Sequence, residues 1–320
     1  MPLVGIAKMA AESSLLEDKR RVSYLELPAK SFIGACSGKR HIFTWTVNPY
    51  RGCEYGCRYC YARYTHEFME LSVEEFETRI FAKQWDAAQF RRELKKLAPG
   101  DVVAFGTATD CYQPAERRYG LMRKMLRELS GRVDEVTIGI TTKSDLVMRD
   151  LDLLAPMARH NDVRVSVTVT TVDTDLARRL EPYAPRPGLR LEAVRRLAAA
   201  GIATGVGMSP VLPFITDSDA SLESVAEAAR AAGAIGMWAQ PLFLKDCAQK
   251  VFLPWLDAEF PALANRYRAW YQQSAYLRGE YVENLKKRVD RVRDRYGLRG
   301  RIATYRPPDW TGPSQMRLFG

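Results

Sequence analysis

Three closely spaced cysteines are the residues of this sequence best suited to chemistry. Cys53, Cys57 and Cys60 follow a Cys-x3-Cys-x2-Cys pattern within residues 48–63. Thiolates are soft ligands that favour zinc or iron–sulfur clusters. A closed structural zinc site needs a fourth ligand, for which His66 is the nearest candidate in the sequence. The spacing alone therefore leaves open an iron–sulfur site, a zinc loop, or three buried cysteines.

The elements that must position this loop alternate regularly. Short β-rich runs cover residues 41–47, 101–106, 135–141, 163–171, 202–208 and 235–240, and helical patterns cover about 84–97, 116–130, 146–159, 189–200 and 220–232. Such alternation predicts β-α-β units and a parallel sheet, an α/β fold. Periodicity does not tell whether the sheet is open or curled. The cysteines directly follow the first run, and this place in a β/α series makes a zinc loop or three buried cysteines less favoured.

The spacing and its place after the first strand resemble the radical S-adenosylmethionine superfamily. The resemblance implies that Cys53, Cys57 and Cys60 hold three irons of a [4Fe-4S] cluster, whose fourth iron binds S-adenosylmethionine. Reductive cleavage would then give a 5′-deoxyadenosyl radical that abstracts hydrogen from a substrate. Tyr59 fits the aromatic residue before the third cysteine. The resemblance further implies a partial (β/α)6 TIM-like barrel, here with a helical basic C-terminal extension, and an electron donor such as flavodoxin or ferredoxin.

A narrower resemblance covers about residues 40–260. It is to the group related to spore photoproduct lyase, often labelled "DNA repair photolyase", and rests on residues 48–63, 65–67, 106–116, 141–144, 149–150, 181–182 and Arg190. By this resemblance Thr109, Lys143 and Ser166 contact S-adenosylmethionine, and Arg190 meets its carboxylate. The alternative is that these polar residues at strand ends cap helices.

Cys111 and Tyr61 are candidate catalytic residues. The spore lyase uses a cysteine after its second strand as a hydrogen-atom donor, but that position falls on Thr107 here and Cys111 lies four residues later. This departure weakens a prediction of thymine-dimer splitting. Cys111 is either a radical-quenching thiol or an inert small residue, and Tyr61 is either a relay or a packing aromatic.

The charge distribution predicts a polyanionic partner. The net charge is +10, and residues 262–320 carry 13 Lys and Arg against 5 Asp and Glu, a surplus of +8. Aromatic residues interleave with these cations, a pattern that suits the phosphates and bases of nucleic acid. The alternative is a basic helix whose aromatics, including Tyr267 and Trp270, face the barrel, and whose cations in 286–295 form ion pairs.

The last six residues form a separate motif. Gln315, Leu318 and Phe319 resemble the short peptide by which bacterial replication and repair proteins dock on the β sliding clamp. The alternative is an apolar tail that folds back on its own domain.

These patterns combine into one hypothesis. The predicted parts are a lead-in (1–40), the barrel (41–245), a helical basic extension (246–300) and an extended tail (301–320). Without a signal-peptide pattern or an apolar run of about 20 residues, we expect no membrane association and a cytoplasmic protein. The leading prediction is a radical S-adenosylmethionine enzyme acting on nucleic acid, DNA rather than RNA, in repair or base modification. The alternatives are a peptide or small-metabolite substrate and a non-enzymatic metal-binding scaffold.

Overall fold

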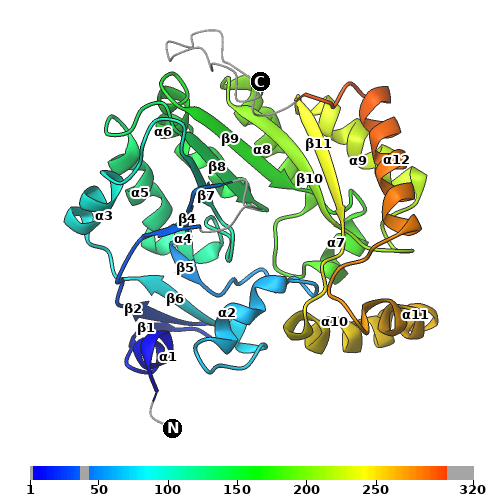
Figure 1. Cartoon of the computed structure of the whole chain (residues 1–320), viewed down its shortest axis with the longest axis horizontal. Helices are drawn as coiled ribbons and strands as arrows, with labels where there is room; N and C mark the ends of the chain where they lie inside the picture. Colours follow the sequence, from blue (N-terminus) through cyan, green and yellow to red (C-terminus); the bar gives the residue numbers. More distant parts are fainter. Residues whose placement is uncertain (1–2, 37–42, 301–320) are drawn as a thin grey trace.

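A parallel sheet forms the centre of the computed structural model, which describes residues 3–36 and 43–300 (Figure 1). Its strands follow one another in chain order, and one antiparallel strand adds to the β4 edge. The parallel strands are β4 (Trp45–Val47), β7 (Val102–Phe105), β8 (Thr137–Thr142), β9 (Asp162–Thr168), β10 (Ala203–Val211) and β11 (Gly236–Pro241), and the antiparallel strand is β3 (Ile33–Ala35). The predicted α/β class with a parallel sheet is confirmed, and the strand order is that of a partial (β/α)6 barrel.

The connecting segments supply the predicted helices, with three differences, one of which is that the first half of the predicted helix at 146–159 is a 3-10 helix. The helices are α3 (Ala87–Leu94), α4 (Pro114–Tyr119), α5 (Leu121–Leu129), the 3-10 helix η3 (Asp145–Asp150), α6 (Leu151–Met157), α7 (Thr174–Leu180), α8 (Pro187–Ala199) and α9 (Asp219–Ala231). The predicted helix at 116–130 is broken because Gly120 adopts a left-handed conformation with φ of 62°. Helix α7 was not predicted, since seven residues carry little periodic signal.

Burial explains why the central strands read as continuous apolar runs. In β10 eight of nine residues are buried, because α8 and α9 pack on this strand and the Trp238 ring covers Gly207. A parallel strand covered on both faces has no polar side to alternate with. The main core therefore lies between the sheet and its helices, and it includes Val165, Val206 and Leu197.

A second, smaller sheet was not predicted. It contains β1 (Ser14–Asp18), β2 (Ser23–Leu27), β6 (Arg79–Lys83) and β5 (Tyr50–Arg51), and α1 (Gly5–Ala11) precedes it. Strand β2 runs parallel to β6 and antiparallel to β1. The sheet thus joins the N-terminal segment to residues on both sides of the cysteine loop. Short elements between β5 and β6 are η1 (Tyr61–Arg63), α2 (Tyr64–Glu67) and η2 (Glu75–Glu77).

The chain after β11 is helical up to Arg295. It forms α10 (Asp246–Glu259), α11 (Pro261–Tyr271) and α12 (Glu280–Arg295). Helices α10 and α11 pack on each other away from the sheet, whereas α12 packs on β11 and α9 (Figure 1). The predicted extended tail at 301–320 lies outside the described residues. Among the described helices, none is both long and apolar enough to span a bilayer.

A buried carboxylate attaches the antiparallel edge strand to the barrel. Glu93 on α3 is 6% exposed. It accepts hydrogen bonds from the backbone N–H groups of Phe32 (3.0 Å) and Ile33 (2.9 Å) and from the Ser31 hydroxyl (2.9 Å). Burial raises the pKa of Glu93, but these hydrogen bonds outweigh burial and leave the pKa below its ordinary value.

Replacing Glu93 by Ala is expected to lower the free energy of unfolding by about 1.5–3 kcal/mol at pH 7. Because the folded-state pKa is depressed, the carboxylate stabilises fully above the unfolded pKa of about 4.3, and the effect is lost as pH falls through the folded-state pKa. Melting curves at neutral and acidic pH should show the gap between wild type and Glu93→Ala narrowing on acidification. The surface variant Glu192→Ala is the control, and a gap independent of pH would contradict this account.

Candidate functional site

The three predicted ligands lie together on the loop that follows β5. Cys53 and Cys57 are each 8% exposed, and Cys60 is half-buried. Burial is the main reason that the pKa of each thiol is raised, to about 12 for Cys57. The three cysteines belong to one cluster of packed side chains. The loop therefore gathers three sulfur ligands in an apolar setting.

The start of this loop lies directly on the backbone of the segment before β6. A Cβ atom on Gly52 would meet the carbonyl oxygens of Arg79 at 2.8 Å and Phe76 at 2.9 Å. Gly52 also has a φ of 80°, so no other residue type fits here. The Cys53 N–H donates to the Phe76 carbonyl at 2.8 Å. The backbone at the start of β6 and just before it thus packs directly against the residue before the first ligand.

Two side chains that follow β7 hold the same loop from the other side. The Thr109 hydroxyl donates to the Gly52 carbonyl at 2.5 Å, and the Gln113 amide donates to that carbonyl at 2.9 Å. Gln113 also accepts from the Glu54 N–H at 3.0 Å. Thr109 was predicted to contact the cosubstrate, and the structure places its hydroxyl on the loop backbone. Gln113, which has no exposed surface, was missed because nothing in its sequence context marks a clamp.

The N-terminal segment reaches this loop as well. The Tyr24 hydroxyl of β2 donates to the Glu54 carboxylate at 2.9 Å, and Arg21 donates to the Glu54 carbonyl at 3.3 Å. Burial raises the pKa of Glu54. Residues before the barrel therefore support the site, a role that their mixed polar composition did not reveal.

A buried group of charges stands beside the cysteines. Glu181 and Arg190 are each 1% exposed at the side chain and pair at 2.5 Å. The Tyr59 hydroxyl donates to Glu181, and the Thr170 hydroxyl donates to the same carboxylate at 2.9 Å. Burial raises the pKa of Glu181, but Arg190 and then Lys143 outweigh burial and lower it. Glu181 lay in the sequence motif at 181–182 but was not predicted as a site residue.

Lys143 adds a second cation to this group. Its ammonium lies 5.6 Å from the centroid of the Tyr59 ring. Burial lowers the pKa of Lys143, yet the Cys57 thiol and Glu181 outweigh burial and raise it. Asp110 holds the adjoining backbone, because it accepts from the Lys143 N–H at 2.7 Å and from the Thr142 hydroxyl at 2.7 Å.

Arg190 is held entirely by the protein in this structure. Besides Glu181, its guanidinium donates to the carbonyl of Pro185 at 2.7 Å and to that of Thr168 at 3.2 Å. It was predicted to meet a carboxylate of the cosubstrate. The carboxylate that it meets here is Glu181, so any contact with a ligand stays a prediction.

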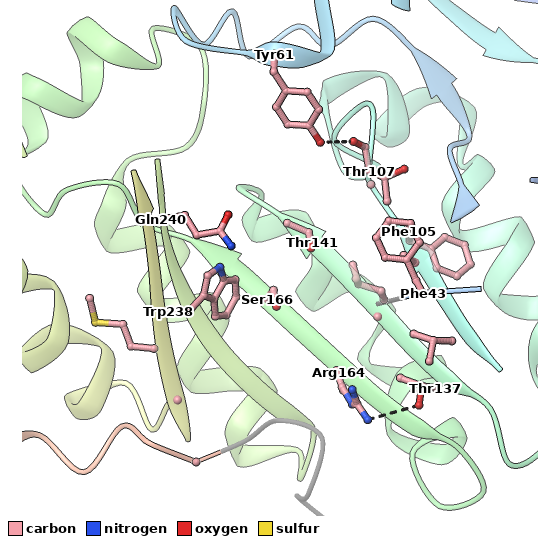
Figure 2. Close-up of a pocket in the computed structure, with 18 of the residues that line it drawn as sticks. Phe43, Tyr61, Phe105, Thr107, Thr137, Thr141, Arg164, Ser166, Trp238 and Gln240 are labelled. Atoms are coloured by element: carbon pink, nitrogen blue, oxygen red, sulfur yellow. Dashed lines mark hydrogen bonds between the residues drawn. The ribbon is translucent and has the colours of Figure 1, made fainter. Parts of the chain in front are cut away.

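A cavity of about 680 Å³ runs along the inner face of the sheet (Figure 2). Tyr61 and Ser166, two of the predicted site residues, line it, and the Tyr61 hydroxyl donates to the Thr107 carbonyl at 2.6 Å across its rim. The indole of Trp238 on β11 also faces the cavity, packed so closely on Gly207 that a Cβ there would collide with the ring. Trp238 was not predicted, because its strand position shows only as part of an apolar run.

Cys111 lies in the core instead of in the cavity. It has no exposed surface, and burial raises its pKa well above the ordinary value. Its neighbours in the core cluster include Phe105 and Met122. This placement favours the interpretation of a small core residue. A catalytic role for Cys111 stays a prediction without support from the geometry.

His66, the fourth ligand that the zinc interpretation would use, lies in an apolar setting beside two phenylalanine rings. His66 has no exposed surface, its Nε2 lies 3.0 Å from the Arg79 carbonyl, and its ring packs against Phe76 and Phe81. Among the described residues, no three His, Cys, Asp or Glu side chains converge as ligands of one ion. Thiolates around one zinc lie about 3.8 Å apart, from the Zn–S bond length. A cluster binds each thiolate through a different iron and needs no such common point.

Glu116, Arg149 and Asp150, which belong to the motifs shared with the spore photoproduct lyase group, form a structural network. Arg149 bonds Glu116 at 2.6 Å and Asp150 at 2.8 Å, and both acids have no exposed surface. Glu116 also accepts from the backbone N–H groups of Met122 and Arg123, at the start of α5. This network joins the segments after β7 and β8, which carry Thr109 and Lys143.

The C-terminal helices contain most of the predicted basic and aromatic residues, and many of them have protein partners. Arg288 pairs with Asp219 at 2.6 Å, and Arg295 pairs with Glu223. The Tyr267 ring is 1% exposed and its hydroxyl donates to a backbone carbonyl. For these residues, the ion pairs and the burial match the alternative of a basic helix whose cations form ion pairs and whose aromatic residues pack on the protein.

Known proteins resemble this chain in sequence and in fold. The family model described as "Radical SAM superfamily" matches residues 47–225. Uncharacterized proteins of Mycobacterium tuberculosis and Mycobacterium bovis are 38% identical over 260 residues, which is 81% of this chain and 76% of theirs. A protein of Methanocaldococcus jannaschii is 27% identical over 173 residues, 54% of this chain and 62% of its own length.

Solved structures of spore photoproduct lyase share the fold. One of them, a mutant with bound AdoMet and dinucleoside spore photoproduct, aligns with a TM-score of 0.63 at 15% identity and covers 85% of this chain and 79% of its own. At this identity the likeness concerns the fold alone.

Replacing Gln113 by Ala is expected to loosen the cysteine loop. The change removes one donor from the Gly52 carbonyl and leaves the buried Glu54 N–H without its acceptor. A loss of about 1.4 kcal/mol makes loop opening about tenfold more frequent. Alkylation of Cys53, Cys57 and Cys60 in metal-free protein should accelerate by that factor. Gln249→Ala, which removes one bond to Leu244, is the control, and equal alkylation rates would argue against the clamp.

Proposed function

This chain belongs to the radical SAM superfamily, and we propose that it is an enzyme of nucleic-acid repair or base modification. One observation carries the proposal: a cavity lined by the half-buried indole of Trp238 adjoins the cysteine loop through Tyr61. The size of about 680 Å³ lies within the range of small-molecule sites. A nucleotide taken out of its stack would fit such a space and stack on the Trp238 ring.

The cofactors of the superfamily are a [4Fe-4S] cluster and S-adenosylmethionine. Three thiols and no fourth protein ligand are what this pair requires, because the remaining iron binds the cosubstrate. Cys53, Cys57 and Cys60, gathered on one held loop, fit this arrangement. When bound, the cluster supplies the electron that cleaves S-adenosylmethionine to a 5′-deoxyadenosyl radical.

Some of the surrounding side chains would contact the cosubstrate directly, and others would position the residues that do. Lys143 brings a positive charge near Cys57, which suits a carboxylate ligand, and the Ser166 hydroxyl faces the cavity. Thr109 acts through the loop backbone, and Arg190 with Tyr59 acts through Glu181. Flavodoxin or ferredoxin is the kind of donor that would supply the electron, in the reducing cytoplasm.

DNA is favoured over RNA only by the fold shared with spore photoproduct lyase. A second candidate keeps the enzyme and replaces nucleic acid by a peptide or small metabolite. The ion pairs of Arg288 and Arg295 favour this candidate, because they reduce the charge that the C-terminal region offers to phosphates. The two candidates differ in whether a polyanion binds.

Cleavage of S-adenosylmethionine is expected to depend on Cys57. Anaerobically reconstituted protein with dithionite should bind about four irons and release 5′-deoxyadenosine and methionine. The Cys57→Ala variant should lose most of its iron and release neither product. Cys36→Ala changes a cysteine outside the loop and should behave as wild type. If Cys57→Ala kept its iron and its activity, the assignment of Cys57 as a cluster ligand would be wrong.

The substrate class is decided in the same reaction. Damaged DNA, undamaged DNA, RNA and a peptide mixture are each added, and modified products are sought by mass spectrometry. The proposal expects a modified nucleotide. A modified peptide, with unchanged nucleic acid, would establish the second candidate instead.

The last six residues are proposed to bind the β sliding clamp. This rests on the sequence of Gln315, Leu318 and Phe319, which lie outside the described residues. Full-length protein should retain the clamp in a pull-down, and the Leu318→Ala/Phe319→Ala variant should retain at least tenfold less. Equal recovery by both proteins would refute clamp binding without affecting the proposed chemistry.

A further inference from the structure

A continuous row of aromatic rings leads from the cavity onto the surface. We propose that this aromatic ladder binds the single-stranded nucleic acid that flanks the nucleotide in the cavity, an inference that rests on the proposed function. The ladder consists, in spatial order, of Phe68, Tyr64, Tyr61, Phe243 and Tyr276. They come from the loop after the cysteines, from the segment after β11, and from the connection between α11 and α12.

Each ring of the ladder contacts the next. The centroid distances are 5.4 Å for Phe68–Tyr64 and 6.4 Å for Tyr64–Tyr61. They are 5.7 Å for Tyr61–Phe243 and 4.3 Å for Phe243–Tyr276. Two of these pairs are nearly parallel, with interplanar angles of 17° and 26°. The ladder is therefore one surface built from distant parts of the chain.

Three of the five rings of the ladder are exposed, and the two that join them, Tyr64 and Phe243, are half-buried. Phe68 is 62% exposed, Tyr276 is 60% exposed and Tyr61 is 40% exposed. Contiguous exposed apolar surface on a folded protein usually marks a binding site. Isolated exposed aromatics would need no such explanation.

Two hollows adjoin the ladder, one at its middle ring, Tyr61, and one at its Tyr276 end. Tyr61 lines the cavity and, as Figure 2 shows, stands at its rim opposite Trp238 and Gln240. Tyr276 lines a second hollow of about 650 Å³ together with Trp270 and Arg278. A chain-like ligand that enters the cavity can therefore continue along the ladder.

The charges along the ladder select a polyanion. The Lys245 ammonium lies 4.2 Å from the Tyr64 ring centroid, and Arg278 is exposed at the second hollow. The acid beside Phe68, Glu67, is paired with Lys250 at 3.0 Å. Lysine is depleted in the apolar centre of protein–protein interfaces, whereas aromatics interleaved with cations are typical of single-strand binding. A duplex offers no free base faces to these rings.

The test compares variants in binding to a labelled single-stranded oligonucleotide of about 12 nucleotides. Reconstituted full-length protein is titrated by fluorescence anisotropy at several salt concentrations. The Phe68→Ala/Tyr276→Ala double variant is expected to raise the Kd about tenfold or more, with an unchanged salt slope. Lys245→Gln should instead reduce that slope by about 0.7. Leu15→Ala, at a residue equally exposed at 62% on β1, is the matched control.

Melting curves check that each variant is folded. The Tyr276→Trp variant keeps an aromatic ring and should bind the oligonucleotide as wild type does. Release of 5′-deoxyadenosine without substrate should be unchanged in the double variant. Equal Kd values for the double variant and wild type would overturn the ladder and leave the proposed function standing. No binding of DNA or RNA by an active wild type would overturn both. Ladder-dependent binding of a peptide instead of the oligonucleotide would also overturn the inference.

Discussion

The hydrogen bonds to the Gly52 carbonyl are the interactions on which the rest of the site depends. Thr109 and Gln113 donate to this one oxygen, and the carbonyls of Phe76 and Arg79 leave no room for a side chain at position 52. Three ligands on one loop can share a cluster only if the loop backbone keeps its shape, because each free dihedral spreads the sulfur positions. The barrel and the small sheet therefore act on the same short segment from opposite sides.

Charge balance explains the group beside the loop. Glu181 and Arg190 neutralise each other at 2.5 Å. Lys143 then leaves one positive charge near Cys57 at a half-buried position, where an unpaired charge is costly. Thiolates that ligate a cluster carry the opposite charge, so the excess matches the state in which the cofactor is bound. Tyr59 joins both features, because its hydroxyl bonds Glu181 and its ring lies beneath Lys143.

The surface chemistry depends on which cations and rings remain accessible. The excess of basic residues in 262–320 suggested a broad polyanion surface. In the structure, Arg288 and Arg295 are paired with acids and Tyr267 is buried. The ladder beside the cavity also offers accessible aromatic surface, and it combines rings from the segment between β4 and β7 and from the chain after β11 with Lys245. Its middle ring, Tyr61, lines the cavity and directly follows Cys60 in the chain.

The sequence by itself determined the six β/α units, the parallel sheet and the three sulfur ligands. These features depend on spacing within short windows, where periodicity and motif are readable. Only the tertiary structure decided the small sheet, the Gln113 clamp, the packing of His66 against Phe76 and Phe81 and the location of Cys111 in the core. Strand β2 pairs with β6 more than fifty residues away, and β5 has two residues, so neither carries a local signal. Burial and partner choice depend on contacts between distant segments, which no local pattern records.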